Sequence, residues 1–496
     1  MHFPVASPSS SPGFYVRLVS VLRLMMVLAL PVSRSLAAPV DYTATINPHV
    51  VLVDNFEGWG TSLCWWANVL GGSTNREQYA DLAFKKLQLN IVRYNIGGGE
   101  NPAIPNSMEL RARMPGFAPR PGVWDWNADA NQRWFLRAAV ARGANRVEAF
   151  ANSPPYWMTV SGSTAGATNA ADNNLRAECE PLFADYLATV VSNLTVLDGV
   201  TFNFVTPMNE PGSDSYWAYG GRQEGDHMSP DQQARMIKLL RSALDRRGLF
   251  AGLIGSEDTA EQLAYESVSA YDPATQKMLS RVATHTYHAN NPDGLRRLAA
   301  AIGRPLWISE YGDGEPSGLM LARRIRDDIV QTRASAWIYW QFAEPGGNWG
   351  LVRYRARNPD GPFSLNKKFY VMSQFSRFIR PGFQILEAGD TNSLAAYDPA
   401  GHQLVVVSVN GGEHPLTVAY DLGAFRVSDA PVRCCRTSDS EDLQTVDSLA
   451  ITGGKLISTL LPRSVTTLVI TDIYPAASAA TSPPSAPPGQ RPATVN

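Results

Sequence analysis

Two glutamates, 100 positions apart, are the residues of this 496-residue chain whose setting points most directly to chemistry. Glu210 follows the strand-like run 201–208, and Glu310 ends the strand-like run 304–310. Two carboxyl groups that separate strands deliver to one end of a barrel can cleave a glycosidic bond. One of them protonates the leaving sugar oxygen, while the other attacks or stabilises the sugar carbon.

The segments around these glutamates alternate between short β-branched runs and amphipathic stretches, from about residue 56 to 345. We expect strands at roughly 56–62, 91–98, 146–153, 201–208, 250–256, 281–287, 304–310 and 335–342. We expect helices at 75–89, 128–142, 175–193, 230–247 and 318–333, with the eighth at 366–379. Eight strand–helix units predict an α/β fold, a (β/α)8 TIM barrel over residues 56–380, whose active site lies in the loops after the strands.

The sequence pattern changes at Pro381-Gly382, where short alternating runs separated by Gly, Asn and Asp begin. These runs predict an appended all-β sandwich domain over residues 381–474. Residues 39–55 are also strand-like, and we expect this N-terminal strand to join the sandwich. Residues 475–496 are rich in Pro, Ala and Ser, which predicts a disordered tail.

Residues 1–38 have the pattern of a signal peptide. Arg17 and Arg23 precede the apolar run 24–30, and small residues at 35–38 offer a cleavage site. The apolar run is well short of the ~20 residues that a membrane span needs. We therefore expect a secreted, extracellular protein with no membrane partner, and Asn193 in Asn-Leu-Thr as a glycosylation acceptor.

The composition excludes several classes of partner. The 43 basic and 45 acidic residues nearly balance and form no basic stripe, which argues against a nucleic-acid partner. No His or Cys spacing resembles zinc ligation, so we expect neither a metal nor any other cofactor. Four cysteines allow three full disulfide pairings, and the sequence does not choose among Cys64, Cys179, Cys434 and Cys435.

The predicted strand ends carry further polar and aromatic groups, which a barrel brings to one mouth. An arginine there can keep a carboxylate ionised, an asparagine can hydrogen-bond a sugar hydroxyl, and tryptophans offer flat faces to the C–H side of a sugar ring. The residues at these ends are Arg93, Asn152, Trp157, Asn209, His285, Tyr287 and Trp340.

Four motifs together resemble those of glycoside hydrolase family 30: Trp59-Gly-Thr-Ser-Leu63, Asn152-Ser-Pro-Pro-Tyr-Trp157-Met, Pro207-Met-Asn209-Glu210-Pro and Ile308-Ser-Glu310-Tyr-Gly. The resemblance covers nearly the whole mature chain. Segments 57–66 and 220–225 are most similar to the endo-β-1,6-galactanase group. The family implies retention of anomeric configuration, with Glu210 as acid/base and Glu310 as nucleophile. It also implies supporting roles for Arg93, Asn209, Tyr287 and Trp340.

In the implied reaction, Glu310 attacks the anomeric carbon, Glu210 protonates the leaving oxygen, and water then releases the glycosyl-enzyme. This requires carboxyl groups ~5–5.5 Å apart, whereas ~6.5–9.5 Å indicates inversion. Asn152 departs from the family pattern, because many members have a tryptophan at this position. Our hypothesis is that the smaller amide makes room for, and hydrogen-bonds, the axial 4-hydroxyl of galactose.

Some strand-end residues also have a purely structural interpretation. Glu257 and Asp258 end a strand as well and could rival the chosen carboxylates. Glu148 lies in the middle of a strand, where we expect a buried polar contact. Arg93 could pair with a structural acid, and we expect His285 to be a core or wall residue.

The loops after the strands hold further candidates. Arg222 and Glu224 follow Glu210 in a glycine-rich loop and are candidate subsite residues. Candidate sugar platforms, each of which could equally pack inside the fold, are Trp65, Trp66, Trp217, Tyr219 and Trp349.

The resemblance therefore implies a secreted retaining glycoside hydrolase, a monomer, that cleaves β-1,6-galactosidic bonds in the galactan side chains of arabinogalactan. One alternative is a β-1,6-glucanase or glucosylceramidase-like hydrolase on the same fold. A second alternative is a non-catalytic carbohydrate-binding protein, against which the presence of both carboxylates argues. Endo and exo action stay open, since they depend on whether loops close the cleft.

Overall fold

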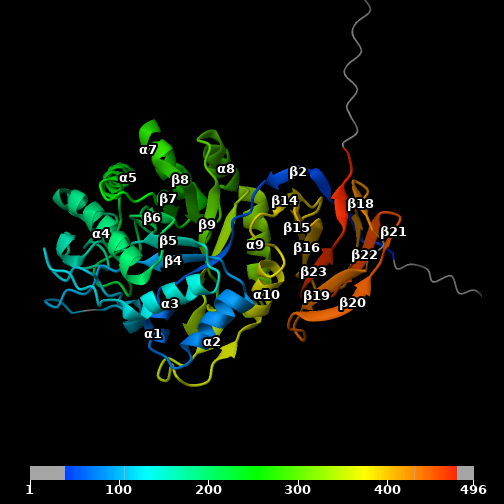
Figure 1. The fold of residues 1–496 in the computed structure, drawn as a ribbon, viewed down its shortest axis with the longest axis horizontal. Helices are drawn as coiled ribbons and strands as arrows, with labels where there is room; N and C mark the ends of the chain where they lie inside the picture. Colours follow the sequence, from blue (N-terminus) through cyan, green and yellow to red (C-terminus); the bar gives the residue numbers. More distant parts are fainter. Residues whose placement is uncertain (1–38, 106, 429–430, 478–496) are drawn as a thin grey trace, which may run out of the picture. The chain divides into compact units, whose positions relative to one another are not determined.

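Eight parallel strands close into a barrel, and their ring order is β10-β3-β4-β5-β6-β7-β8-β9. Strands β4 to β9 are labelled in Figure 1. The structure is a computed structural model that describes residues 39–105, 107–428 and 431–477. The barrel strands are β3 (Gly58–Ser62), β4 (Ile91–Asn95), β5 (Arg146–Phe150), β6 (Phe204–Thr206), β7 (Gly252–Asp258), β8 (Leu279–His285), β9 (Leu306–Tyr311) and β10 (Ala336–Gln341). The predicted (β/α)8 barrel is confirmed.

The barrel strands are buried on both faces, as expected for parallel strands that helices cover. Inward-facing apolar side chains fill the barrel as a separate core cluster that includes Phe204, Trp307 and Ile338. Below this cluster, Glu57 pairs with Arg281 at 2.9 Å and accepts the indole N–H of Trp307. The barrel interior is therefore packed.

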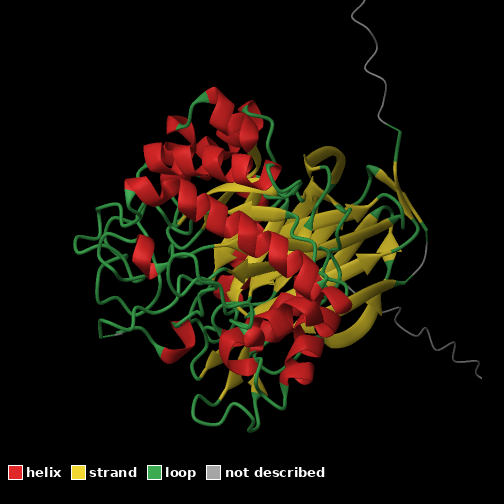
Figure 2. Ribbon diagram, turned by 60° about the vertical axis from the view of Figure 1, so that its left-hand side comes forward, coloured by secondary structure: helices red, strands yellow, loops and turns green. Residues whose placement is uncertain are grey.

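Helices surround the barrel, and Figure 2 shows them packed against the strands, with long loops gathered to one side. They are α1 (Trp66–Leu70), α2 (Arg76–Ala80) with the π-helical turn Asp81–Lys86, α3 (Ala130–Ala141), α4 (Glu180–Asp198), α5 (Pro230–Asp245), α6 (Glu261–Ala270), α7 (Pro273–Met278), α8 (Pro292–Ala301), α9 (Leu319–Thr332) and α10 (Lys367–Ser376). Local sequence sets several ends. Asp272 caps α7 through the N–H groups of Ala274 and Thr275, and α4 ends at Gly199 in the left-handed conformation.

Two further sheets build the predicted all-β domain. A seven-stranded sheet has the order β2-β14-β15-β16-β23-β19-β20, and a four-stranded sheet has the order β1-β17-β22-β21. The strands of the larger sheet are β2 (Asn47–Val53), β14 (Gln384–Glu387), β15 (Ser393–Asp398), β16 (Gln403–Asn410), β19 (Val432–Thr437), β20 (Gln444–Leu449) and β23 (Ser464–Ile470). Those of the smaller sheet are β1 (Tyr42–Thr45), β17 (Leu416–Asp421), β21 (Ile451–Thr452) and β22 (Lys455–Leu460).

The N-terminal segment contributes a strand to each of these sheets, since β1 pairs with β17 and β2 pairs with β14. A common core lies between the two sheets, and β22 shows the alternating burial of a strand with one face inward. Gln374 on α10 links the larger sheet to the barrel, because its side chain bonds the hydroxyls of Thr437 and Thr467.

Strand β24 (Ile473–Pro475) pairs with β18 (Phe425–Val427), so Pro475, the first residue of the predicted tail, belongs to paired backbone. The N–H of Ala476 still donates to the carbonyl of Ala424. Residues 478–496 of the predicted tail and residues 1–38 of the predicted signal peptide lie outside the described residues.

All four cysteines are free thiols in the described residues. Cys434 and Cys435 are consecutive in β19, where neighbouring side chains point to opposite faces, so a bond between them would break the extended strand. A small three-stranded sheet, β11 (Ala343–Pro345), β12 (Val352–Tyr354) and β13 (Ser364–Leu365), follows the last barrel strand. Within the described part of the chain, no helix combines the length and apolar character needed to span a bilayer.

Candidate active site

Glu210 and Glu310 meet at the mouth of the barrel. Glu310 lies within β9, whereas Glu210 lies four positions after β6 ends, in a left-handed backbone conformation with φ of 50°. The N–H of Glu210 donates to the carbonyl of Glu257, and its own carbonyl accepts the indole N–H of Trp217 at 2.9 Å. One carboxyl oxygen of Glu210 and one of Glu310 lie within 4.8 Å of each other.

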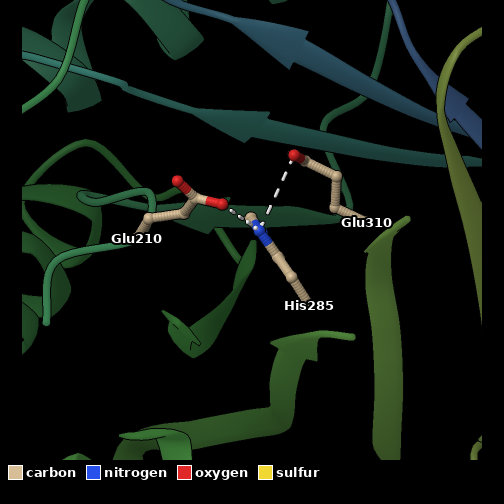
Figure 3. Close-up of side chains that lie close together, drawn as sticks. All are labelled: Glu210, His285 and Glu310. Atoms are coloured by element: carbon tan, nitrogen blue, oxygen red, sulfur yellow. Dashed lines mark hydrogen bonds and ion pairs between the residues drawn. The ribbon is translucent and has the colours of Figure 1, made fainter. Parts of the chain in front are cut away.

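His285, the last residue of β8, lies between the two carboxylates (Figure 3). Its Nδ1 is 2.9 Å from Glu210 Oε1 and 3.7 Å from Glu310 Oε1, and its Nε2 is 3.5 Å from Glu257 Oε2. Burial lowers the pKa of His285, but Glu310, Glu210 and Glu257 together outweigh burial and raise it to about 10. The imidazole is therefore cationic at neutral pH. Its Nδ1 donates to Glu210, while Glu257 and Glu310 lie within ion-pair distance.

Arg93 on β4 connects the nucleophile candidate to the buried side of the site. Its guanidinium is fully buried and donates to Glu310 at 2.8 Å, to Glu257 at 3.0 Å and to the side-chain oxygen of Asn209 at 3.2 Å. Burial opposes the charge, yet Glu257, Glu148 and Glu310 raise the pKa of Arg93 above its ordinary value. Arg93 therefore binds the nucleophile candidate and the structural acids at the same time.

The rival carboxylates lie behind the cleft. Glu257 and Glu148 are fully buried, and both contact Arg93, Glu148 at 3.3 Å. Burial raises the pKa of Glu148 to about 8, and the charge of Glu257 adds to the rise. Burial also disfavours the charge of Glu257, but Arg93 and His285 outweigh it and lower the pKa of Glu257. Asp258 binds the hydroxyl of Ser256 and the N–H of Gly212, which is a structural role.

Two donors hold the carboxylate of Glu310. The hydroxyl of Tyr287, two positions after β8, donates to Oε1 at 3.0 Å, and Arg93 donates to Oε2. Burial raises the pKa of Glu310, whereas the positive charges of His285 and Arg93 lower it, and a net rise remains. The donors therefore orient Glu310 and partly offset the cost of burying its charge.

A cleft of about 900 Å³ opens above the two glutamates. Of the predicted substrate-binding residues, Asn209, Trp217, Tyr287 and Trp340 line it. The loop residues Trp65, Arg222 and Trp349, considered as candidates from the sequence, line it as well. The lining residues that sequence reasoning did not single out include Arg111, Tyr216, His288 and Glu344, which no motif surrounds.

Charged residues on the cleft wall pair with one another. Arg111 contacts Glu344 at 3.0 Å and Glu109 at 3.0 Å, and Arg222 contacts Glu109 at 2.7 Å. The guanidinium of Arg111 also lies over the ring of Trp65, 4.9 Å from its centroid, and so covers one side of that candidate platform. These contacts tie the loops after β4, β6 and β10 into one wall.

Four predicted binding residues do not line the cleft, and one of them, Arg93, is fully buried against Glu310. Trp157 donates its indole N–H to the carbonyl of Ala118 and packs against the main core. Glu224 is fully buried and accepts the N–H of Gly98 at 2.9 Å, so it holds two loops together. Asn152 is 3% exposed, and its amide nitrogen has no hydrogen-bond partner among the described residues, so its role in substrate selection stays a prediction.

Two further candidate sugar platforms, Trp66 and Tyr219, do not line the cleft. Trp66 is buried in the main core, where its indole N–H donates to the carbonyl of Ser62. Tyr219 is 47% exposed but lies away from the cleft, at a small surface hollow. The sequence predicts a core or wall residue at His285, whereas the structure places it in contact with both glutamates. Its position at the end of a barrel strand is the sequence signal for a place at the mouth.

Glu210, His285 and Glu310 also have the spacing of a three-ligand metal site, since a donor atom of each lies within 4.8 Å of the others. Two features of these residues oppose a cation there. A pKa of about 10 keeps the imidazole of His285 protonated, so that its nitrogens donate rather than ligate. Arg93 already places a positive charge 2.8 Å from Glu310. The set fits proton transfer and nucleophilic attack better than metal binding.

Comparison with known proteins agrees with this geometry. The model of O-glycosyl hydrolase family 30 matches residues 53–300. The endo-beta-1,6-galactanase of Hypocrea rufa is 31% identical over 469 residues, which cover 88% of this chain and 96% of that protein.

Two solved structures share the fold. A conserved exported protein from Bacteroides fragilis has a TM-score of 0.75 and 22% identity, over 86% of this chain and 100% of that chain. The family 30 subfamily 8 xylanase Xyn30A from Clostridium acetobutylicum has a TM-score of 0.68 and 23% identity, over 86% of this chain and 99% of that chain. With the family match and the 31% identity, these findings establish that the chain belongs to O-glycosyl hydrolase family 30 and is an O-glycosyl hydrolase.

Proposed function

We propose that this protein is a retaining hydrolase of β-1,6-linked galactan, with Glu210 as acid/base and Glu310 as nucleophile. The observation that carries the mechanism is the approach of one oxygen of Glu210 and one of Glu310 to within 4.8 Å. This approach supports retention, for which the two carboxyl groups lie ~5–5.5 Å apart, over inversion, for which they lie ~6.5–9.5 Å apart. Similarity to an endo-beta-1,6-galactanase supports galactan as the substrate.

The reaction takes two displacements. In the first, an oxygen of Glu310 attacks the anomeric carbon, the bond to the leaving sugar breaks, and Glu210 gives its proton to the leaving oxygen. In the second, Glu210, now a carboxylate, takes a proton from water, whose oxygen attacks the same carbon and frees Glu310. Two inversions at one carbon restore the β configuration.

The neighbours of the two glutamates support these steps. Arg93 and Tyr287 each donate to one oxygen of Glu310, so the carboxylate is aimed before the sugar binds. The imidazolium of His285 contacts both glutamates. Its positive charge stabilises negative charge on either of them during the reaction. Asn209 is fixed by Arg93 and lines the cleft, where its amide can bind a hydroxyl next to the reacting carbon.

We further propose internal cleavage of galactan side chains outside the cell. The cleft is lined on both sides of the catalytic pair, by Tyr216 and Trp217 from the loop of Glu210 and by Trp349 from the loop after β10. Such a cleft accommodates sugars on either side of the cleaved bond. Export rests on the signal-like pattern of residues 1–38.

The test is hydrolysis of de-arabinosylated arabinogalactan, followed over time by mass spectrometry and by proton NMR of the first-formed anomer. We expect early mixed galacto-oligosaccharides with the β-anomer first, and no turnover by Glu310→Gln. First appearance of the α-anomer would contradict retention. A single small product from the start would contradict internal cleavage. Release of sugars from β-1,6-glucan but not from galactan would overturn the substrate assignment.

A further inference from the structure

Trp349 is held rigidly at the edge of the cleft although 43% of its surface is exposed. One side of its indole lies against the backbone of Gly312 and Gly314, where an added Cβ would come within 3.1 and 3.3 Å of ring atoms. The hydroxyl of Tyr339 donates to its main-chain carbonyl. The ring is thus supported on one side and reaches the cleft with the other.

The indole of Trp349 packs against two glycines directly after β9, the strand that carries Glu310. Gly312 and Gly314 follow β9, and Tyr287, which holds Glu310, has its ring centroid 6.5 Å from that of Trp349. The exposed indole therefore lies next to the nucleophile. By contrast, Trp65 is covered by Arg111, and Trp217 is only 5% exposed.

The barrel order tells which part of the substrate reaches Trp349. Strands β6 and β10 lie four apart in the eight-stranded ring, so the loops after them face each other across the mouth. Glu210 lies in the loop after β6, and an acid must stand on the side of the leaving sugar to protonate its oxygen. Trp349, in the loop after β10, consequently faces the other part of the chain, which stays attached to the captured sugar.

We propose that Trp349 is a stacking platform for the galactose that precedes the captured sugar on its non-reducing side. This rests on the proposed retaining mechanism and galactan substrate. The indole face is broad, apolar and weakly negative, and it suits the C–H face of a pyranose. A β-1,6 linkage has one more rotatable bond than a link between ring carbons, so a fixed platform limits the conformations that reach Glu310.

The experiment compares Trp349→Ala and Trp349→Phe with wild type on β-1,6-galacto-oligosaccharides of increasing length, labelled at the reducing end. For oligosaccharides that reach Trp349, we expect Trp349→Ala to lower kcat/KM about tenfold, the loss that ~1.4 kcal/mol of binding free energy represents. The shortest cleaved substrate should lose less than threefold, and Trp349→Phe should recover most of the activity. Cleavage should also shift along the labelled chain.

Trp124→Ala is the matched control. Trp124 is 37% exposed and stacks on Trp126, but it does not line the cleft. The Trp124→Ala variant should leave kcat/KM unchanged at every oligosaccharide length. Equal losses by Trp349→Ala at all lengths, or no loss at any length, would overturn the platform.

A binding measurement separates this proposal from the proposed function. In the Glu310→Gln background, calorimetry with β-1,6-galactotetraose should show a Kd about tenfold weaker when Trp349 is also changed to alanine. If the wild-type enzyme cleaves no galactan and Glu310→Gln binds no galactotetraose, the substrate assignment is refuted. Cleavage by wild type with equal Kd values for the single and double variants would refute the platform alone.

Discussion

The hydrogen bond from Tyr287 to Glu310 offers a clean test of how the nucleophile is held. Its donor oxygen lies 3.0 Å from Glu310 Oε1, and Tyr287→Phe removes that oxygen while keeping the ring that packs near Tyr311 and Trp349. Arg93 still binds the other oxygen of Glu310. The substitution therefore loosens one end of the carboxylate without removing its charge partner.

The size of the effect follows from the type of bond. A hydrogen bond to a charged acceptor contributes ~1.5–3 kcal/mol. At ~1.4 kcal/mol for each factor of ten in rate, kcat should fall by roughly 10- to 100-fold on galactan. KM should change less than threefold, because the hydroxyl acts on Glu310 and the bulk of the cleft is unchanged. Loss of a donor to the carboxylate should also move the acid limb of the kcat/KM profile to higher pH.

Tyr271→Phe is the control for a general loss of a buried phenol. Its hydroxyl donates to Gln233 at 2.5 Å, and neither residue lines the cleft. It should lower the thermal midpoint while kcat stays within twofold of wild type. A folded Tyr287→Phe enzyme with kcat reduced less than threefold and an unmoved acid limb would refute the view that Tyr287 positions the nucleophile.

Three further predictions concern charge. His285→Gln should lower kcat at least tenfold and move the acid limb of kcat/KM upward, since the imidazolium lowers the pKa of Glu310; an unmoved limb would contradict this. Arg93→Met leaves Glu257 and Glu310 without their buried cation and should lower the free energy of unfolding by ~3–5 kcal/mol in urea titrations. A loss below 1 kcal/mol would argue against it. Stability should fall as pH rises from about 4 to about 8. Burial raises the pKa of Asp129 to about 7 and of Glu224 and Asp226 to about 8, so the folded state binds more protons than the unfolded chain across this range. Thermal midpoints that rise over the range would contradict this, and Glu224→Gln should flatten the slope.

The barrel and its catalytic candidates could be predicted because both depend on local pattern. Alternating strand and helix periods define the ring, and parallel strands bring their carboxyl ends to one mouth whatever their order in the chain. Glu310 sits inside its strand as expected. Glu210 lies four residues beyond β6, in a loop and with a positive φ, yet this loop still returns it to the mouth.

Side-chain direction after a strand could not be predicted, since tertiary partners decide it. Trp157 and Glu224 lie in loops after β5 and β6, as Glu210 does after β6. The indole of Trp157 donates to the carbonyl of Ala118 and so points away from the cleft. The carboxylate of Glu224 accepts from the N–H of Gly98 and is buried there. Neither partner is adjacent in sequence, so no local signal distinguishes a wall residue from a loop anchor.

The charged groups beneath the cleft pair with one another. These pairings distinguish the groups that support the site from the group that attacks the sugar. Burial raises the pKa of Glu148 to about 8, and its carboxyl lies 3.3 Å from Arg93. The anion of Glu257 is shared between Arg93 at 3.0 Å and His285 at 3.5 Å, which satisfies it below the mouth. The same two cations reach Glu310 from behind and leave its front open to the cleft. A neutral substitution at Glu257 therefore disturbs the cations first and the sugar only through them, whereas one at Glu310 removes the attacking oxygen itself.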